Sequence, residues 1–183
     1  MAVGALRRVK GRVRRRPLLL GVLAIGVVGG LVIFALGARP DASSSVPVGL
    51  ADAYVGTTYA FDGTLCLGSP RVSAKVLSLE VEQAPGTRTE VRRLAEGTRV
   101  VLGFPVEGND GLDPVGARVP AGEDDCTFRV LVTPTEQGPV QAGTVRVELG
   151  YGPFGLLRRT ASVQPNVTLD VTGSGTDPRT DLD

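Results

Sequence analysis

The sequence predicts a mainly β protein, in which one N-terminal transmembrane helix precedes an antiparallel, Ig-like β-sandwich of about seven or eight short strands. Three observations support this prediction. Residues 17–38 form an uncharged apolar run, segments beyond residue 56 alternate apolar and polar residues, and 25 glycines and 13 prolines favour tight turns between them. Because the expected strand spacing of roughly 10–15 residues also suits a small β-barrel, the barrel is the alternative fold.

The N-terminal segment, residues 1–16, is basic and contains no acid; its seven charged residues are Arg7, Arg8, Lys10, Arg12, Arg14, Arg15 and Arg16. As a helix, the apolar run at 17–38 would extend about 33 Å, enough to span the hydrocarbon core of a bilayer. Positive charge ahead of such a helix keeps that side in the cytoplasm. We therefore expect a single-pass protein of the plasma membrane, with a cytoplasmic N-terminus and an extracytoplasmic C-terminal domain.

A cleaved signal peptide is the alternative interpretation of the same run. Signal peptides have apolar regions of about 7–15 residues, shorter than this one, although "FALGARP" contains the small residues that a cleavage site needs. Gly26 and Gly30 have the GxxxG spacing that lets two membrane helices pack closely as a homodimer. Glycine is common in membrane helices in any case, so this spacing alone does not establish a homodimer.

Composition divides the rest of the chain into three parts. Residues 39–55 are rich in Ser, Pro and Ala and are expected to form a tether. Residues 56–172 are expected to form the sandwich, and residues 173–183 a disordered acidic tail. Because seven of the 20 Lys and Arg residues precede the apolar run, 13 remain in these parts against all 19 Asp and Glu residues. The extracytoplasmic part is therefore net negative.

Strands are predicted where apolar residues recur at every second position, since successive side chains of a strand point to opposite faces. In "KVLSLEVEQ", Leu77, Leu79 and Val81 alternate with polar residues. Four later segments repeat this pattern and place the following residues on one face of a half-buried strand: Val100, Leu102 and Phe104; Cys126, Phe128, Val130 and Val132; Val145, Val147 and Leu149; Val167, Leu169 and Val171. Arg129 falls on the opposite, polar face.

Cys66 and Cys126 are the two cysteines of the chain. Both follow the apolar run and are expected in an oxidising compartment, where an isolated pair normally forms a disulfide. Two cysteines without histidine cannot build a tetrahedral zinc site. A bridge that closes a loop of this length should contribute about 4 kcal/mol. The tryptophan that packs on the inter-sheet disulfide of antibody domains is absent here, so the likeness to that bridge is partial.

The chain contains no histidine and no tryptophan, and aromatic residues make up 4% of it. Without histidine, the usual general base and activator of Ser or Cys nucleophiles is missing, so we expect neither an enzyme nor a cofactor. A Ser–Lys dyad is the remaining nucleophile design; Lys75 lies near Ser73 and Ser78, but neither serine has S-x-x-K spacing. A net negative domain with few aromatic residues also argues against nucleic acid as a partner.

Residues 105–125 are long for a loop, which indicates either a functional segment or a hidden element. A short edge strand at "VGARVP", ended by Pro120, would divide the segment. The segment is acidic, and its candidate calcium ligands are Glu107, Asp110, Asp113, Asp124 and Asp125. Calcium binds through oxygen ligands, but this spacing is not that of an EF-hand loop. A solvated acidic loop is the alternative.

By exclusion, the sequence predicts a non-catalytic interaction module of a bacterial cell envelope. Residues 17–38 would hold it in the membrane, and its partner would be another membrane or envelope protein. One alternative is an ion- or ligand-binding domain that uses residues 105–125. A hydrolase built on Lys75 is a third hypothesis.

Overall fold

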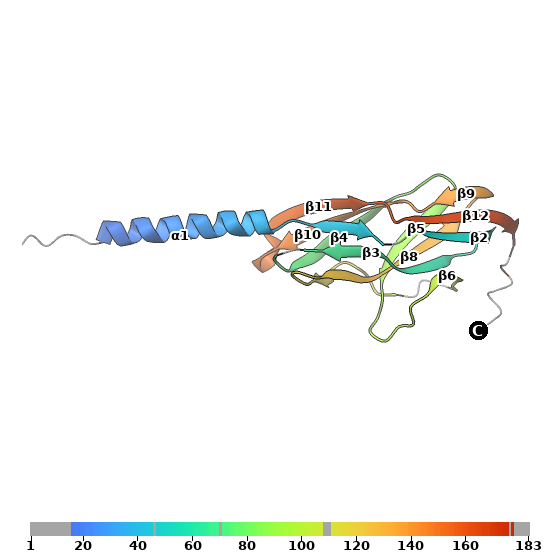
Figure 1. The fold of residues 1–183 in the computed structure, drawn as a ribbon, viewed down its shortest axis with the longest axis horizontal. Helices are drawn as coiled ribbons and strands as arrows, with labels where there is room; N and C mark the ends of the chain where they lie inside the picture. Colours follow the sequence, from blue (N-terminus) through green and yellow to red (C-terminus); the bar gives the residue numbers. More distant parts are fainter. Residues whose placement is uncertain (1–15, 46, 70, 108–110, 176, 178–183) are drawn as a thin grey trace, which may run out of the picture. The chain divides into compact units, whose positions relative to one another are not determined.

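The computed structural model describes residues 16–45, 47–69, 71–107, 111–175 and 177. The chain divides into two compact units, the first ending at Phe34 and the second beginning at Ala35. All strands belong to the second unit. Figure 1 shows these strands running side by side along the length of that unit.

The helix α1 spans Arg16–Gly37. Among the residues whose side chains the structure describes, no helix is long and apolar enough to cross a membrane. The predicted basic cluster falls on residues 7–16, and all of it except Arg16 lies outside the described residues. A Cβ built on Gly26 or Gly30 would meet no heavy atom within 4 Å.

The first sheet has β3 and β8 at its centre. Its strands are, in order, β1 (Asp41–Ser44), β3 (Tyr59–Gly68), β8 (Asp124–Pro134) and β5 (Thr87–Arg93), with β6 (Leu102–Pro105) also paired to β3. Two strands share one edge of β3: β1 pairs with residues 65–68 and β6 with residues 59–61. All these pairs are antiparallel.

The second sheet contains, in order, β11 (Leu157–Val163), β10 (Thr144–Tyr151), β4 (Ala74–Glu82) and β7 (Arg118–Val119). A third sheet contains β2 (Val48–Val55), β12 (Val167–Ser174) and β9 (Gly138–Gln141), and its β2–β12 pair is parallel. Short breaks at residues 142–143 and 164–166 separate β9 from β10 and β11 from β12. In the sequence, β9 of the third sheet therefore directly precedes β10 of the second, and β12 of the third directly follows β11 of the second.

This arrangement is an Ig-like sandwich. In the Ig fold, strands A, B, E and D form one sheet and strands C, F and G the other. Here β1, β3, β8 and β5 take the first set of places, and β4, β10 and β11 take the second. The predicted antiparallel, mainly β sandwich is confirmed. The closed alternative is not formed, because β7 and β11 each have one neighbour among the described strands.

The core is formed by large side chains from several strands. The largest fully buried ones include Tyr59, Phe61, Leu65, Phe128, Leu149, Tyr151 and Leu169. The predicted alternation is confirmed in β10 and β12, where every predicted core residue is buried. In β4, by contrast, Leu77, Leu79 and Val81 are half-buried, while Val76 is fully buried.

The predicted tether at residues 39–55 is wrong, because this segment forms β1 and β2. β1 pairs with β3, and β2 pairs with β12. At the start of β2, the Val48 N–H donates to the Asn166 carbonyl at 2.8 Å. These pairs rest on backbone hydrogen bonds, which need no apolar period, so Ser- and Ala-rich residues can form edge strands.

The predicted disordered tail at 173–183 is also wrong where the structure describes it. β12 continues to Ser174, and Asp177 is fully buried. Its carboxylate accepts a hydrogen bond of 2.7 Å from the Tyr59 hydroxyl, which itself accepts one of 2.8 Å from the Tyr54 N–H. The Asp177 carboxylate is therefore hydrogen-bonded to the buried phenol of Tyr59, whereas the sequence predicts a carboxylate exposed to solvent. Residues 178–183 lie outside the described residues.

Candidate functional site

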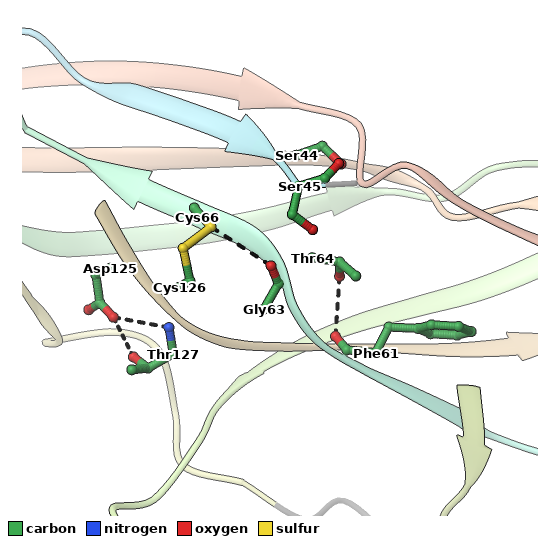
Figure 2. Close-up of a disulfide and its surroundings, with 9 residues drawn as sticks. All are labelled: Ser44, Ser45, Phe61, Gly63, Thr64, Cys66, Asp125, Cys126 and Thr127. Carbon is green, nitrogen blue, oxygen red and sulfur yellow. Dashed lines mark hydrogen bonds between the residues drawn. A yellow bond between two sulfur atoms is a disulfide. The ribbon is translucent and has the colours of Figure 1, made fainter. Parts of the chain in front are cut away.

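The predicted disulfide between Cys66 and Cys126 is confirmed. It joins β3 to β8, which are neighbours in one sheet, and the two Cα atoms are 4.1 Å apart. Figure 2 shows the bridge between these two strands. The inter-sheet bridge of antibody domains is therefore not reproduced. The register of the two strands shifts between residues 65 and 67 of β3, which brings the cysteines opposite each other.

The polar groups around the disulfide hold the local backbone in place. The Cys66 sulfur lies 3.8 Å from the Gly63 carbonyl oxygen, a contact without a donated proton because a bridged sulfur carries none. In Figure 2, Asp125 turns back toward Thr127. Its Oδ1 accepts hydrogen bonds from the Thr127 N–H at 3.1 Å and hydroxyl at 2.5 Å. This carboxylate therefore holds the start of β8 in place.

The candidate calcium ligands are not gathered into one site in the described part of the chain. Asp110 lies outside the described residues. Asp113 accepts a hydrogen bond of 2.8 Å from the Val115 N–H, two residues on, and Asp124 and Asp125 are successive residues of β8. Among the described residues, no three His, Cys, Asp or Glu side chains lie close enough to hold a metal ion. The short strand expected within this segment is present as β7.

The Ser–Lys dyad is not assembled either. Lys75 is exposed on β4, opposite Gly150 of β10 and Arg118 of β7. Ser78 lies on the same strand, opposite Glu148. In the described residues, no hydrogen bond joins the Lys75 ammonium group to the hydroxyl of Ser73 or Ser78.

Sequence reasoning missed the buried ion pair of Asp62 and Arg129. These residues face each other across β3 and β8 and are 3% and 4% exposed. Arg129 Nε and Nη2 donate to the two carboxylate oxygens of Asp62 at 2.7 and 2.9 Å. The sequence pattern placed Arg129 on a solvated face. A charged residue flanked by apolar ones in "TFRVLV" and "YAFDGT" was the available signal.

The ion pair lies beneath the segment 94–101, which leads from β5 at one edge of the sheet to β6 at the other. The Val101 N–H donates to Asp62 Oδ2 at 2.8 Å, and the Asp62 N–H donates to the Val101 carbonyl at 2.9 Å. Arg129 Nη2 reaches the Arg99 carbonyl at 3.5 Å. The pair thus fixes the end of this segment just before β6 begins.

The end of this segment and β6 together present a row of exposed apolar side chains. Val100, Leu102 and Phe104, here called the β6 surface, are 66%, 51% and 58% exposed. The prediction that they share a buried face is wrong. Between two of them Gly103 is buried, with φ 72°, and a Cβ there would lie 3.3 Å from Leu50 Cδ1. β6 therefore turns its glycine inward and leaves its large side chains in solvent.

A cavity of about 310 Å³ lies along the same segment. It is lined by Leu94, Ala95, Thr98, Gly111, Leu112 and Arg129. Leu112 is 54% exposed and its backbone pairs with that of Arg93 at the end of β5. The side chains around this cavity are mostly small or apolar, and its one charged group is already paired with Asp62.

Compared with known proteins, the chain matches no protein-family model and no curated protein. Among solved structures it is similar to the ASH/PapD-like domain of human CEP192 (PapD-like domain 7), at 11% identity and a TM-score of 0.43, over 76% of this chain and 89% of that one. It is also similar to the secreted serine protease VesC of Vibrio cholerae, at 10% identity and a TM-score of 0.34, over 80% of this chain and 26% of that one.

Proposed function

We propose that this chain is a non-catalytic interaction module of the cell envelope, and that it binds an extended apolar segment of a membrane or envelope protein at the β6 surface. The observation that carries the proposal is the exposure of Val100, Leu102 and Phe104 on a short edge strand. Apolar side chains gathered on an exposed edge mark interaction sites more often than solitary ones do.

The backbone of β6 supports this mode of binding. Among the described strands, β6 pairs with β3 alone, so its other edge offers N–H and C=O groups to an added strand. The buried ion pair beneath residues 94–101 holds this edge in one conformation, which lowers the entropy lost when a partner binds. Full burial of a Val, Leu or Phe side chain contributes about 1.5–3 kcal/mol.

Membrane anchoring by residues 17–38 is the second part of the proposal. It is supported by the uncharged apolar sequence and by the seven basic residues that precede it. The Cys66–Cys126 disulfide is consistent with a sandwich domain outside the cytoplasm. In this arrangement the N-terminus is cytoplasmic, and the sandwich stands at the outer face of the plasma membrane.

Photo-crosslinking in intact cells tests the binding surface. A photoreactive amino acid at Leu102 is expected to give a specific adduct, and the added change Phe104→Glu is expected to abolish it. The same probe at Thr168, an exposed residue of β12, serves as the matched control and should not give that adduct. An adduct that survives Phe104→Glu, or that forms equally from Thr168, would contradict the proposal. An adduct of twice the chain's mass would identify a second copy instead of another protein.

A further inference from the structure

The most exposed large apolar side chains of the described residues lie in the turn between β10 and β11. Phe154 and Leu156 are 97% and 80% exposed. The turn has a defined shape, because the Gly155 N–H donates to the Gly152 carbonyl at 3.2 Å. Phe154 has φ 66°, a conformation that residues other than glycine rarely adopt. The fold thus holds two apolar side chains outward.

Cations lie across the strands next to this turn. Arg118 of β7 lies opposite Lys75 of β4, Lys75 opposite Gly150 of β10, and Gly150 opposite Arg158 of β11. Residues directly opposite one another share a face of the sheet. We call Lys75, Arg118 and Arg158, all of them exposed, the basic row.

Few carboxylates lie close enough to neutralise the positive charges of the basic row. Like charges directly opposite each other, such as Lys75 and Arg118, destabilise a sheet. Arg158 has Glu148 at 3.7 Å, but among the described residues no carboxylate lies within 4.0 Å of the charged groups of Lys75 or Arg118. An anion bound from outside would relieve this repulsion.

Both features lie at the end of the domain where the chain leaves α1. Tyr151, the last residue of β10, lies opposite Ala74, the first residue of β4. The loop before β4 contacts Gly37, which belongs to the second unit: a Cβ there would lie 3.4 Å from Arg71 Cβ. β1 begins at Asp41, only four residues after Gly37. A membrane that held residues 17–38 would therefore be close to the β10–β11 turn.

We propose that this end of the domain binds the surface of the membrane. Phe154 and Leu156 enter the headgroup region, and the basic row binds anionic lipid headgroups. The inference rests on the proposed anchoring by residues 17–38. Apolar side chains flanked by cations are the usual composition of surfaces that lie in the membrane interface. The exposed arginines Arg39, Arg71 and Arg159 lie at the same end and strengthen its positive charge.

The acids at this end favour one orientation. Asp41 belongs to β1, and Asp124 opens β8, so both lie in the first sheet; Glu123 lies just before β8. The basic row lies in the second sheet. Arg118, at one end of the basic row, lines a cavity together with Glu123, Asp124 and Asp125. An anionic surface is repelled by these acids and attracted by the cations farther along the row, so the domain approaches the membrane with its β4–β10–β11 side.

The chain contains no tryptophan, so a single introduced tryptophan is a specific reporter of lipid contact. Phe154→Trp in the full chain, reconstituted in phosphatidylcholine–phosphatidylglycerol vesicles, is expected to show blue-shifted emission and quenching by brominated lipid. Leu156→Trp provides an independent second reporter. Thr168→Trp, on β12, is the matched control and is expected to be quenched by aqueous iodide and not by brominated lipid.

The basic row is tested in the Phe154→Trp background. Changing Lys75 and Arg118 to Gln is expected to weaken the preference for phosphatidylglycerol about fivefold for each charge removed. The control Arg88→Gln removes a cation of β5 that is paired with Glu90 at 2.8 Å, and it should leave that preference unchanged. Equal quenching in vesicles with and without phosphatidylglycerol would overturn the role of the basic row.

Flotation of the same vesicles separates the two proposals. If the full chain does not float with the vesicles, the anchoring part of the proposed function is wrong. If it floats while both tryptophan reporters stay in water, anchoring stands and surface binding is overturned. Shielding of the reporters only after envelope proteins are added would also overturn it, because the surface would then bind a protein.

Discussion

Asp62 and Arg129 form a bidentate ion pair that is almost completely buried, with contacts of 2.7 and 2.9 Å between neighbouring strands of one sheet. Each partner also binds the backbone just before β6, through Val101 and Arg99. The ion pair therefore also fixes the end of the segment that leads into β6, the strand that carries Leu102 and Phe104 of the β6 surface.

Breaking this pair should be costly. Arg129→Met leaves the Asp62 carboxylate buried without its cation, which is expected to lower the free energy of unfolding by about 3–5 kcal/mol. Replacing both residues, as in Asp62→Leu with Arg129→Met, should cost much less than the single change, because no uncompensated charge remains. Urea unfolding measures both values. A double variant less stable than Arg129→Met would contradict the argument.

Removing the disulfide should destabilise the sandwich without changing its fold. Cys66→Ala with Cys126→Ala is expected to lower the free energy of unfolding by about 4 kcal/mol, from the loop that the bridge closes. Reductant should lower the stability of the native chain and leave the double variant unaffected. In intact cells, a thiol reagent should label neither cysteine; labelling of both would contradict an extracytoplasmic domain.

Tyr151 should make the domain sensitive to alkali. Burial raises the pKa of this phenol, while the nearby Ser69 hydroxyl and the charge of Arg159 lower it by smaller amounts. The Ser69 hydroxyl donates to the Val72 carbonyl, and among the described residues the Tyr151 hydroxyl has no hydrogen-bond partner of good geometry. We therefore regard burial as the dominant cause.

The sign follows from proton binding. Between the ordinary phenol pKa of about 10 and the raised folded value, the native state holds more protons than the unfolded state. The contribution of Tyr151 to the free energy of unfolding is therefore fully present below about pH 10, and it is lost as the pH rises through the pKa of the folded state. Tyr151→Phe should keep or raise stability at neutral pH, because it removes an unsatisfied buried hydroxyl. It should also reduce the alkaline loss in a pH series of unfolding curves; an identical loss in both proteins would refute this role.

Gly103 should resist substitution more than Gly97, the glycine of the segment that precedes β6. Gly103→Ala introduces a Cβ at φ 72°, 3.3 Å from Leu50, and should cost about 1–2 kcal/mol from the backbone strain alone. Gly97→Ala is the matched control, since φ is 82° there and no heavy atom lies within 4 Å of the new Cβ. The excess cost at Gly103 measures the contact with Leu50. Equal losses of unfolding free energy would show that this contact is unimportant.

The sandwich was predictable from local patterns, and the site was not. Alternation identified β10 and β12 because each buries one face, as with Val145 and Val147. The same alternation cannot tell which face is inside, so the β6 surface was assigned to the wrong environment. Arg129 is buried because Asp62 lies opposite it on a strand 67 residues away in sequence. That partner is set by strand register and not by any neighbouring residue.

The oxidising compartment expected for both cysteines predicted the disulfide, but it did not predict which strands the disulfide joins. The chain contains no histidine, and both cysteines follow the apolar run; these two facts were sufficient to predict that the cysteines pair. Its location within one sheet depends on the order of β3 and β8, which the spacing of the cysteines does not encode. β1 and β2 escaped prediction for a related reason, since their pairing uses backbone groups that every residue has.

The position of β1 also bears on mechanical load. Ser43 of β1 lies opposite Cys66, which is bonded to Cys126 of β8. If α1 is held in a membrane and a partner pulls on β6, the two forces act at opposite ends of β3, because β1 and β6 pair with different halves of that strand. The hydrogen bonds of β1 are then loaded in shear and must break together, and the disulfide passes the tension into the centre of the sheet. In single-molecule stretching, reduction of the bridge should therefore lower the unfolding force when load is applied through the N-terminal end of the domain.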